Sequence, residues 1–147
     1  MSGAITELSR ADCLERLAAQ SVGRVALTHH ALPAIVPVNY VLAGGRIIFR
    51  TEPDGMLAHG CDRTVIAFEI DDIDADGCGG WSVLVVGVAE LLDGSAALRA
   101  LEENLVAAAG EGRDQFVAVG IGQVSGRSVG RAIAEVPAQL RRRPATR

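Results

Sequence analysis

An arginine and a threonine stand at the end of an apolar segment, where a β-strand should stop. Residues 46–51 read RIIFRT, and a Pro-Asp-Gly turn and a short helical stretch at about residues 55–61 follow. Arginine offers planar, bidentate donors to phosphate, threonine adds a hydroxyl, and backbone N–H groups at the start of the short helix could face an anion. Arg50 and Thr51 are therefore candidate phosphate ligands. The alternative is a polar strand end in solvent.

The three histidines suggest no catalytic group. His29 and His30 are adjacent on a predicted strand, so we expect their side chains to point to opposite faces and not to chelate as a pair. His59 lies far away in the sequence. No Ser/His/Asp or Cys/His arrangement can be argued from these spacings, so the catalytic residues and the roles of the histidines stay unassigned.

An acidic segment partly matches a calcium-binding loop. Residues 72–77 read DIDADG, but the twelfth position of the loop is Val83, where calcium needs a bidentate glutamate, and a strand precedes the segment where a helix should stand. We therefore expect a solvated turn and no metal site. Carboxylates in this region could act as a paired acid and base only if some were buried, and in a glycine-rich turn we expect them to be solvated instead. They are Asp71, Asp72, Asp74 and Asp76.

Residues 120–126, GIGQVSG, partly match a dinucleotide-binding fingerprint. The last glycine comes one residue late, and more strand follows where that fold needs a helix for the pyrophosphate. Glycines at a bend of a barrel strand explain the segment better.

Composition indicates one ordinary globular domain. The 147 residues are 49% hydrophobic and 22% charged, and the net charge of −4 argues against a nucleic-acid binder. The N-terminus lacks an export signal, and the longest apolar run, residues 81–92, is too short to span a membrane. We expect a soluble, cytoplasmic protein in which the odd set of cysteines, Cys13, Cys61 and Cys78, are buried free thiols.

The order of the predicted elements indicates a mainly β fold. Ser9 and Asp12 resemble a capping box, with Leu14, Leu17 and Ala18 on one helical face. A second helix should begin at Ser95 and end at Gly110. The expected elements are helices at 9–20, 55–61 and 95–110, and strands at 23–30, 33–42, 46–51, 64–73, 81–92 and 116–129.

Six such strands can close into an antiparallel β-barrel with peripheral helices, which removes exposed sheet edges. Residues 1–130 then form one domain, and the basic residues 131–147 form a mobile tail. The strand at 81–92 shows little alternation, which is typical of a strand covered on both faces, in the centre of a sheet or in a subunit interface.

These segments resemble a known family. LSRADCLERLAAQSVGRVAL, VPVNYVLAGGRIIFRTEPDGMLAH and FEIDDIDADGCGGWSVLVVGVAELL are together similar to the pyridoxamine 5′-phosphate oxidase-like family of split β-barrels that bind flavin mononucleotide (FMN). The resemblance runs from about residue 9 to 130 and lies in the order of the segments more than in one motif.

The resemblance implies a homodimer with FMN bound between the subunits. It places strand residues 37–40 along the isoalloxazine, largely through backbone groups, and Arg50 and Thr51 on the phosphate and ribityl chain, with the loop at Gly55. A further contact falls at the start of the strand at 81–92. The implied cofactor-binding residues are Val38, Asn39, Tyr40, Arg50, Thr51, Met56, Leu57, Trp81 and Ser82.

The chain departs from the family pattern at Met56 and Leu57, where relatives commonly place a lysine or an Arg-Lys pair. Each charge-assisted bond lost would cost about 1.5–3 kcal/mol, so FMN affinity should fall or another cofactor, a deazaflavin or haem, should be used. The strict vitamin B6 oxidase is a poor match, because its phosphorylated substrate needs basic residues beside the flavin.

The expected function is an FMN-dependent oxidoreductase acting on a small organic substrate, because a cofactor can supply chemistry that the side chains lack. Two alternatives stay open. One is a non-catalytic flavin, deazaflavin or haem binding protein that serves as carrier, store or sensor. The other is a ligand-free barrel whose dimer is its function.

Overall fold

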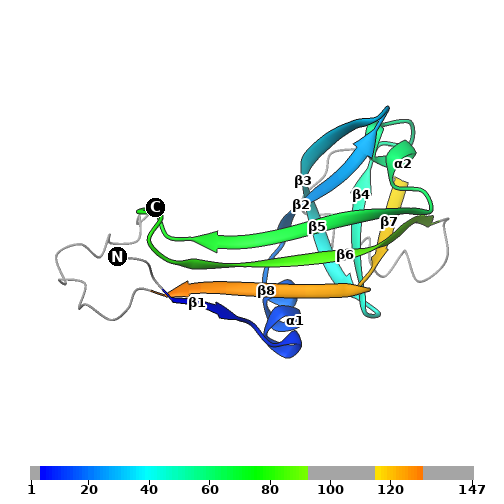
Figure 1. Cartoon of the computed structure of the whole chain (residues 1–147). Coiled ribbons are helices and arrows are strands. Elements are labelled where there is room, and N and C mark those ends of the chain that lie inside the picture. The colour runs from blue at the N-terminus through cyan, green and yellow to red at the C-terminus, as the bar shows by residue number, and fades with distance from the viewer. Residues whose placement is uncertain (1–3, 93–114, 131–147) are drawn as a thin grey trace, which may run out of the picture.

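The structure, a computed structural model, describes residues 4–92 and 115–130 (Figure 1). The predicted helix at 95–110 and the tail at 131–147 lie outside these residues. The elements are β1 (Ala4–Glu7), α1 (Arg10–Ala19), β2 (Val22–His29), β3 (Leu32–Ala43), β4 (Arg46–Thr51), α2 (Met56–Gly60), β5 (Thr64–Ile73), β6 (Gly80–Leu92), β7 (Gln115–Gly120) and β8 (Gln123–Gly130).

Six strands close into a barrel. The sheet has the order β1-β8-β6-β5-β2-β3-β4-β7, and β7 pairs back with β6, so that β6, β5, β2, β3, β4 and β7 form the closed ring. All of these pairings are antiparallel. The predicted barrel is therefore confirmed, and two further strands, β8 and β1, extend the sheet from β6 (Figure 1).

The strand β6 belongs to two parts of the sheet. Its first half, Gly80–Val86, pairs with β8, and its last residues, Ala89–Leu92, pair with β7. Between these halves, a Cβ added at Gly87 would overlap the carbonyl oxygen of Gly120, so only glycine permits this close approach. Strand β8 pairs with β6 before Gly87, and β7 pairs with β6 after it, so the sheet divides at this point.

The prediction of one strand over 116–129 was wrong, because the chain bends in the middle of that segment. Gly122 donates its backbone N–H to the carbonyl oxygen of Gly120 at 3.0 Å, and the strand resumes at Gln123 as β8. The interpretation of the glycine run as a bend in a barrel strand is confirmed. The same bend lets β7 and β8 pair with different parts of β6.

The barrel interior is aliphatic, as expected, with two aromatic rings in contact. Tyr40 and Phe68 meet edge to face with ring centroids 4.8 Å apart. The Tyr40 hydroxyl donates a hydrogen bond of 2.6 Å to the carbonyl oxygen of Leu17, and burial raises the pKa of Tyr40 to about 12. This bond ties α1 to the barrel. Cys61 is also buried, and burial raises its pKa to about 11.

Helix α1 begins where the capping pattern predicts. The Asp12 backbone N–H donates to the Ser9 hydroxyl at 3.1 Å, and that hydroxyl donates to the Asp12 carboxylate at 2.6 Å. These bonds lower the pKa of Asp12. Cys13 and Leu17 face the core, but the prediction that Ala18 shares this face was wrong, because Ala18 is exposed.

Cys78 does not follow the expectation of buried thiols. It is exposed in the turn after β5, where its backbone N–H donates to the Asp76 carboxylate at 3.0 Å. Gly77 donates its N–H to the Asp74 carbonyl oxygen at 2.8 Å, so the acidic segment forms an exposed turn.

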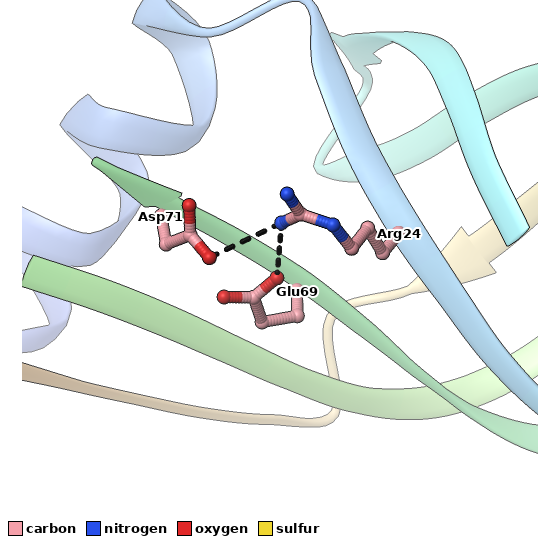
Figure 2. A network of polar contacts seen from close by, with 3 residues as sticks. All are labelled: Arg24, Glu69 and Asp71. Atoms are coloured by element: carbon pink, nitrogen blue, oxygen red, sulfur yellow. Dashed lines mark hydrogen bonds and ion pairs between the residues drawn. The ribbon is translucent and has the colours of Figure 1, made fainter. Parts of the chain in front are cut away.

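The outward side of β3, β2, β5 and β6 carries many apolar side chains. We call it the outer apolar face, and its residues alternate with the core residues of the same strands: Ala26, Ile35, Val65, Ala67, Leu84, Val86 and Val88. An ion network lies at one end of this face, where Arg24 contacts Glu69 and Asp71 at 3.1 Å each (Figure 2). Because buried and outward residues alternate along β6, this longest apolar strand has one side in the core and one side on the outer apolar face.

No helix in residues 4–92 or 115–130 is long and apolar enough to cross a membrane.

Candidate functional site

The strands β3 and β4 separate where the sequence places the cofactor. Their pairing covers Tyr40–Ala43 against Arg46–Phe49 and then stops. Before Tyr40, β3 pairs with β2 on one edge, and no strand in the described part of the chain pairs with the other edge. We call residues 36–39 on this second edge the β3 edge. Because strand N–H and C=O groups point alternately to the two edges, the β3 edge can offer backbone donors and acceptors to a ligand.

The side chains of the β3 edge point in two directions. Val38 and Tyr40 are buried in the barrel core, whereas Asn39 is exposed on the outward side. Val38 and Tyr40 can therefore contact a ligand only through their backbone groups. The predicted contacts along this strand are of that kind.

Arg50 and Thr51 lie at the end of β4, beside the β3 edge. Both are half-buried and pair with Phe116 and Gln115 of β7. The Gly55 N–H donates to the Glu52 carbonyl oxygen at 3.1 Å, which folds the turn back toward the strand. A Cβ added at Gly55 would lie 3.9 Å from the Thr51 hydroxyl oxygen. The predicted phosphate segment is therefore compact.

The side chains of Met56 and Leu57, which follow this turn, lie in different surroundings. Leu57 is buried in the core, so its side chain does not face a ligand. Met56 is half-buried and lines an open pocket of about 550 Å³ with His29, His30, Asp54 and His59. We call this the histidine pocket.

The prediction that His29 and His30 face opposite sides was wrong. His30 has a φ of 50° and leaves the strand for the hairpin turn, which brings its ring to 4.0 Å from that of His29 at an angle of 79°. Partial burial first, and then repulsion from His30 and His59, lower the pKa of His29. Adjacent histidines at a hairpin turn were the sequence signal for this cluster.

Trp81 and Ser82 lie in a different pocket of about 250 Å³, at the tip of the β5–β6 hairpin. We call it the tryptophan pocket. The Arg16 guanidinium lies 5.1 Å from the centroid of the Trp81 ring and covers it from α1. The pocket is lined by Ile5, Ile73, Gly77, Gly79, Gly80, Trp81, Ser82, Arg127 and Val129. Sequence reasoning missed Arg127, which pairs with Ser82 across the ladder.

The two pockets lie at opposite ends of β5 and β6, since one is lined from α2 and the other from the turn between these strands; Figure 1 shows these two elements far apart. Trp81 lies near the start of β6. Helix α2 comes just before β5, whose first residue, Thr64, pairs with Ala89 near the end of β6. Eight residues of strand separate Trp81 from Ala89, or about 26 Å at 3.3 Å per residue. The structure therefore brings Arg50, Thr51 and Met56 near one another, but it does not bring Trp81 and Ser82 to them within one chain.

The histidines do not form a metal centre as they are arranged. Within the two described ranges, no group of three or more His, Cys, Asp or Glu side chains could hold a metal ion. This is also true of the acidic turn at residues 72–77.

Comparison with known proteins identifies the family. Residues 9–128 match the family model of pyridoxamine 5′-phosphate oxidase. An FAD binding protein of Mycobacterium smegmatis has 28% identity and a TM-score of 0.67, covering 86% of this chain and 100% of its own. A conserved protein of unknown function from Corynebacterium diphtheriae, DIP1874, also has 28% identity and a TM-score of 0.67, covering 86% of this chain and 98% of its own.

A curated relative adds sequence similarity over a shorter region. The uncharacterized protein Rv0080 of Mycobacterium tuberculosis is 39% identical over 90 residues, which is 58% of this chain and 59% of the relative. The match thus spans little more than half of that protein. The family model, in contrast, covers most of the chain and agrees with the closed barrel. The chain belongs to the pyridoxamine 5′-phosphate oxidase family.

Proposed function

We propose that the chain is a flavin-dependent oxidoreductase that binds FMN and acts on a small organic substrate, as a homodimer in the cytoplasm. The observation that carries the proposal is the β3 edge, which lies open beside Arg50 and Thr51 at the end of β4. Family membership and the similarity to an FAD binding protein support a flavin.

The residues present fit a flavin nucleotide. The β3 edge supplies backbone groups for the polar rim of a flat ring, and Arg50 and Thr51 supply a cation and a hydroxyl for a phosphate. A bound flavin would supply the hydride or electron transfer. The chain itself would hold the ring against the apolar barrel and keep water from it.

The outer apolar face supports the homodimer. The exposed fractions of Ile35, Val65 and Val88 are 70%, 63% and 56%, which is unusual for so many neighbouring apolar side chains. A second copy on this face would cover them. It would also allow Trp81 and Ser82 of one copy to approach the β3 edge of the other, which would unite the two groups of predicted contacts.

Light scattering tests the dimer. We expect twice the chain mass of 15.3 kDa, and a shift toward the monomer for Val88→Glu, which places a charge on the face beside Val65. Leu32→Glu, an exposed apolar position at the tip of the β2–β3 hairpin that does not belong to this face, is the matched control and should matter less. A monomer at all dilutions of the unmodified chain would contradict the homodimer.

Titration and visible absorbance test the flavin. The purified protein is titrated in parallel with FMN, FAD, a deazaflavin and haem. We expect a flavin spectrum that dithionite or NAD(P)H bleaches. A Soret band would instead indicate haem, and the absence of binding to every compound would refute the proposal.

A non-catalytic flavin carrier is the second candidate, and one observation favours it. In the described part of the chain, no Asp, Glu, His, Lys or Arg side chain is buried, so the core offers no shielded carboxylate, imidazole or amine. A carrier would bind flavin tightly but show no turnover of NAD(P)H with any electron acceptor. Steady-state turnover would exclude it.

A further inference from the structure

The histidine pocket contains three imidazoles to which the proposed function gives no role. His29 ends β2, His30 begins the following turn, and His59 lies on α2. A Cβ added at Gly60 would lie 3.9 Å from Nδ1 of His29, so α2 lies directly against this ring. Three groups that can each donate hydrogen bonds and gain a positive charge therefore gather around one hollow.

The pocket adjoins the predicted phosphate segment. Met56 lines the pocket and directly follows Gly55, which lies beside the Thr51 hydroxyl. A ligand whose ring lies on the β3 edge and whose chain passes Arg50 and Thr51 would therefore reach the pocket with its far end. At that point the chain has Met56, which carries no charge.

We propose that His29, His30 and His59 form an oxyanion subsite that binds the phosphate end of the flavin nucleotide, an inference that rests on the proposed function. The histidines take the place of a permanently charged side chain at Met56. Imidazoles suit this task because their N–H groups donate to phosphate oxygens and their protonated forms add charge-assisted bonds.

Binding at such a subsite depends on pH, and the direction follows from the charges. Partial burial first, and then the charges of His30 and His59, lower the pKa of His29 in the free protein. A bound phosphate offsets this repulsion and raises the pKa of His29, so that binding takes up protons. Affinity should therefore increase as the pH falls toward about 6.5, the ordinary pKa of histidine.

Asp54 opposes the anion. Its carboxylate is the single acidic group among the residues that line the pocket. It is exposed, so solvent screens its repulsion. Its removal should strengthen anion binding at every pH.

The experiment compares riboflavin, FMN and FAD by quenching of flavin fluorescence between about pH 5.5 and about pH 8.5, a range that spans the histidine pKa. Riboflavin has no phosphate, so the affinity ratio between FAD and riboflavin reports on the diphosphate and adenosine, and the change of this ratio with pH reports on the groups that titrate beside them. The FMN phosphate itself titrates near pH 6, whereas the diphosphate of FAD keeps its charge, so FAD isolates the protonation of the protein. We expect the ratio to rise about ten-fold from pH 8 to pH 6, the factor that one charge-assisted bond supplies.

Substitutions identify the groups responsible. The double variant His29→Gln with His59→Gln keeps hydrogen-bonding groups but leaves His30 as the one imidazole of the pocket, so its ratio should be lower and should change less with pH. Adding Met56→Lys to this double variant should restore a high ratio without restoring the steeper pH dependence of the unmodified chain, because lysine stays charged over this range. Asp54→Asn should raise the ratio, and Glu15→Gln, a matched carboxylate change on the exposed side of α1, should not.

The outcomes separate the subsite from the function. If riboflavin binds but the double variant, folded by circular dichroism, keeps the pH profile of the unmodified chain, the subsite is refuted while the flavin-binding function stands. Stoichiometric zinc binding by the three histidines with an unchanged FAD ratio would also refute it. If none of the flavins binds, the proposed function and the subsite are both refuted.

Discussion

The histidine pocket and the tryptophan pocket lie at opposite ends of β5 and β6 and use different chemistry. The first is polar and gathers three imidazoles beside one carboxylate. The second is lined mainly by glycines and apolar side chains and holds the guanidinium of Arg127. The difference shows that the predicted contacts of one cofactor need not form one site in a single chain. It favours an arrangement in which two copies combine unlike ends.

The largest effect should come from the point on β6 that lies between the two ends. Gly87→Ala would place a methyl group on the Gly120 carbonyl oxygen, where neither backbone can move freely. We expect a loss of about 3 kcal/mol in the free energy of unfolding, at the upper end of ordinary overpacking. Urea unfolding measures it.

Gly130→Ala is the control for this change, because nothing lies within 4 Å of an added Cβ there. If Gly87→Ala were as stable as the control, the backbones of Gly87 and Gly120 would not be held in close contact.

Alkaline pH should weaken the core that separates the pockets. Burial raises the pKa of Cys61 from 9.0 to about 11 and that of Tyr40 from 10.0 to about 12. The folded chain thus keeps protons that the unfolded chain has lost, so stability declines as the pH rises above about 9. At 1.36 kcal/mol per pKa unit, each group contributes a loss of about 2–3 kcal/mol by about pH 12.

Urea unfolding between about pH 8 and about pH 10.5 tests this direction, since it brackets the first of these titrations. Cys61→Ala should reduce the slope of stability against pH in this range, whatever it does to absolute stability. A stability that does not fall with pH would show that neither proton is held by burial.

Flavin binding can distinguish the two ends directly. Arg50→Ala should weaken FMN at least ten-fold, or about 1.4 kcal/mol, with little effect on riboflavin, because the guanidinium serves the phosphate. Trp81→Leu should weaken FMN and riboflavin equally if a second copy brings Trp81 to the ring. Fluorescence titration reports both.

An unchanged FMN titration for Arg50→Ala would remove Arg50 from the site. No effect of Trp81→Leu on either ligand would mean that the tryptophan pocket serves another purpose.

The smallest effect should come from the ion network at the end of the outer apolar face. Arg24 is half exposed, so solvent screens its contacts with Glu69 and Asp71, and these should contribute little to stability (Figure 2). Arg24→Gln should therefore change the midpoint of unfolding little. Arg46→Gln, which breaks the comparable contact with Glu90, is the matched control.

A larger loss for Arg24→Gln than for Arg46→Gln in the dimer would indicate that a second copy buries the network. Partial burial and the neighbouring Asp71 already raise the pKa of Glu69 despite the contact with Arg24.

Periodicity predicted most of the barrel because each core strand has one inward face. The hairpins around β2, β3 and β4 follow from alternating residues and from the Gly44-Gly45 turn, where φ is 58° and 70°. β1 escaped prediction because its four residues are all exposed and carry no alternation. The glycine run predicted a bend near residues 120–122, but the division into β7 and β8 also involves the contact of Gly120 with Gly87, which no local pattern encodes.

The candidate site was predicted in part. Arg50, Thr51 and the turn at Gly55 are neighbours in sequence, so local reasoning could place them together. The histidine pocket could not be found in this way, since it depends on a left-handed residue at His30 and on the packing of α2 against β2. Contact between Trp81 and a ligand on the β3 edge would require a second chain, and local sequence patterns do not encode contacts between chains.

The division of β6 also has a consequence for hydrogen exchange. Gly87 and Val88 pair with β5 on one edge, but neither has a ladder partner in β7 or β8 on the other. The best-paired strand of the sheet therefore contains a short interval at which protection should drop. If the chain opens there first, the two ends of the barrel can fluctuate separately, each with its own pocket.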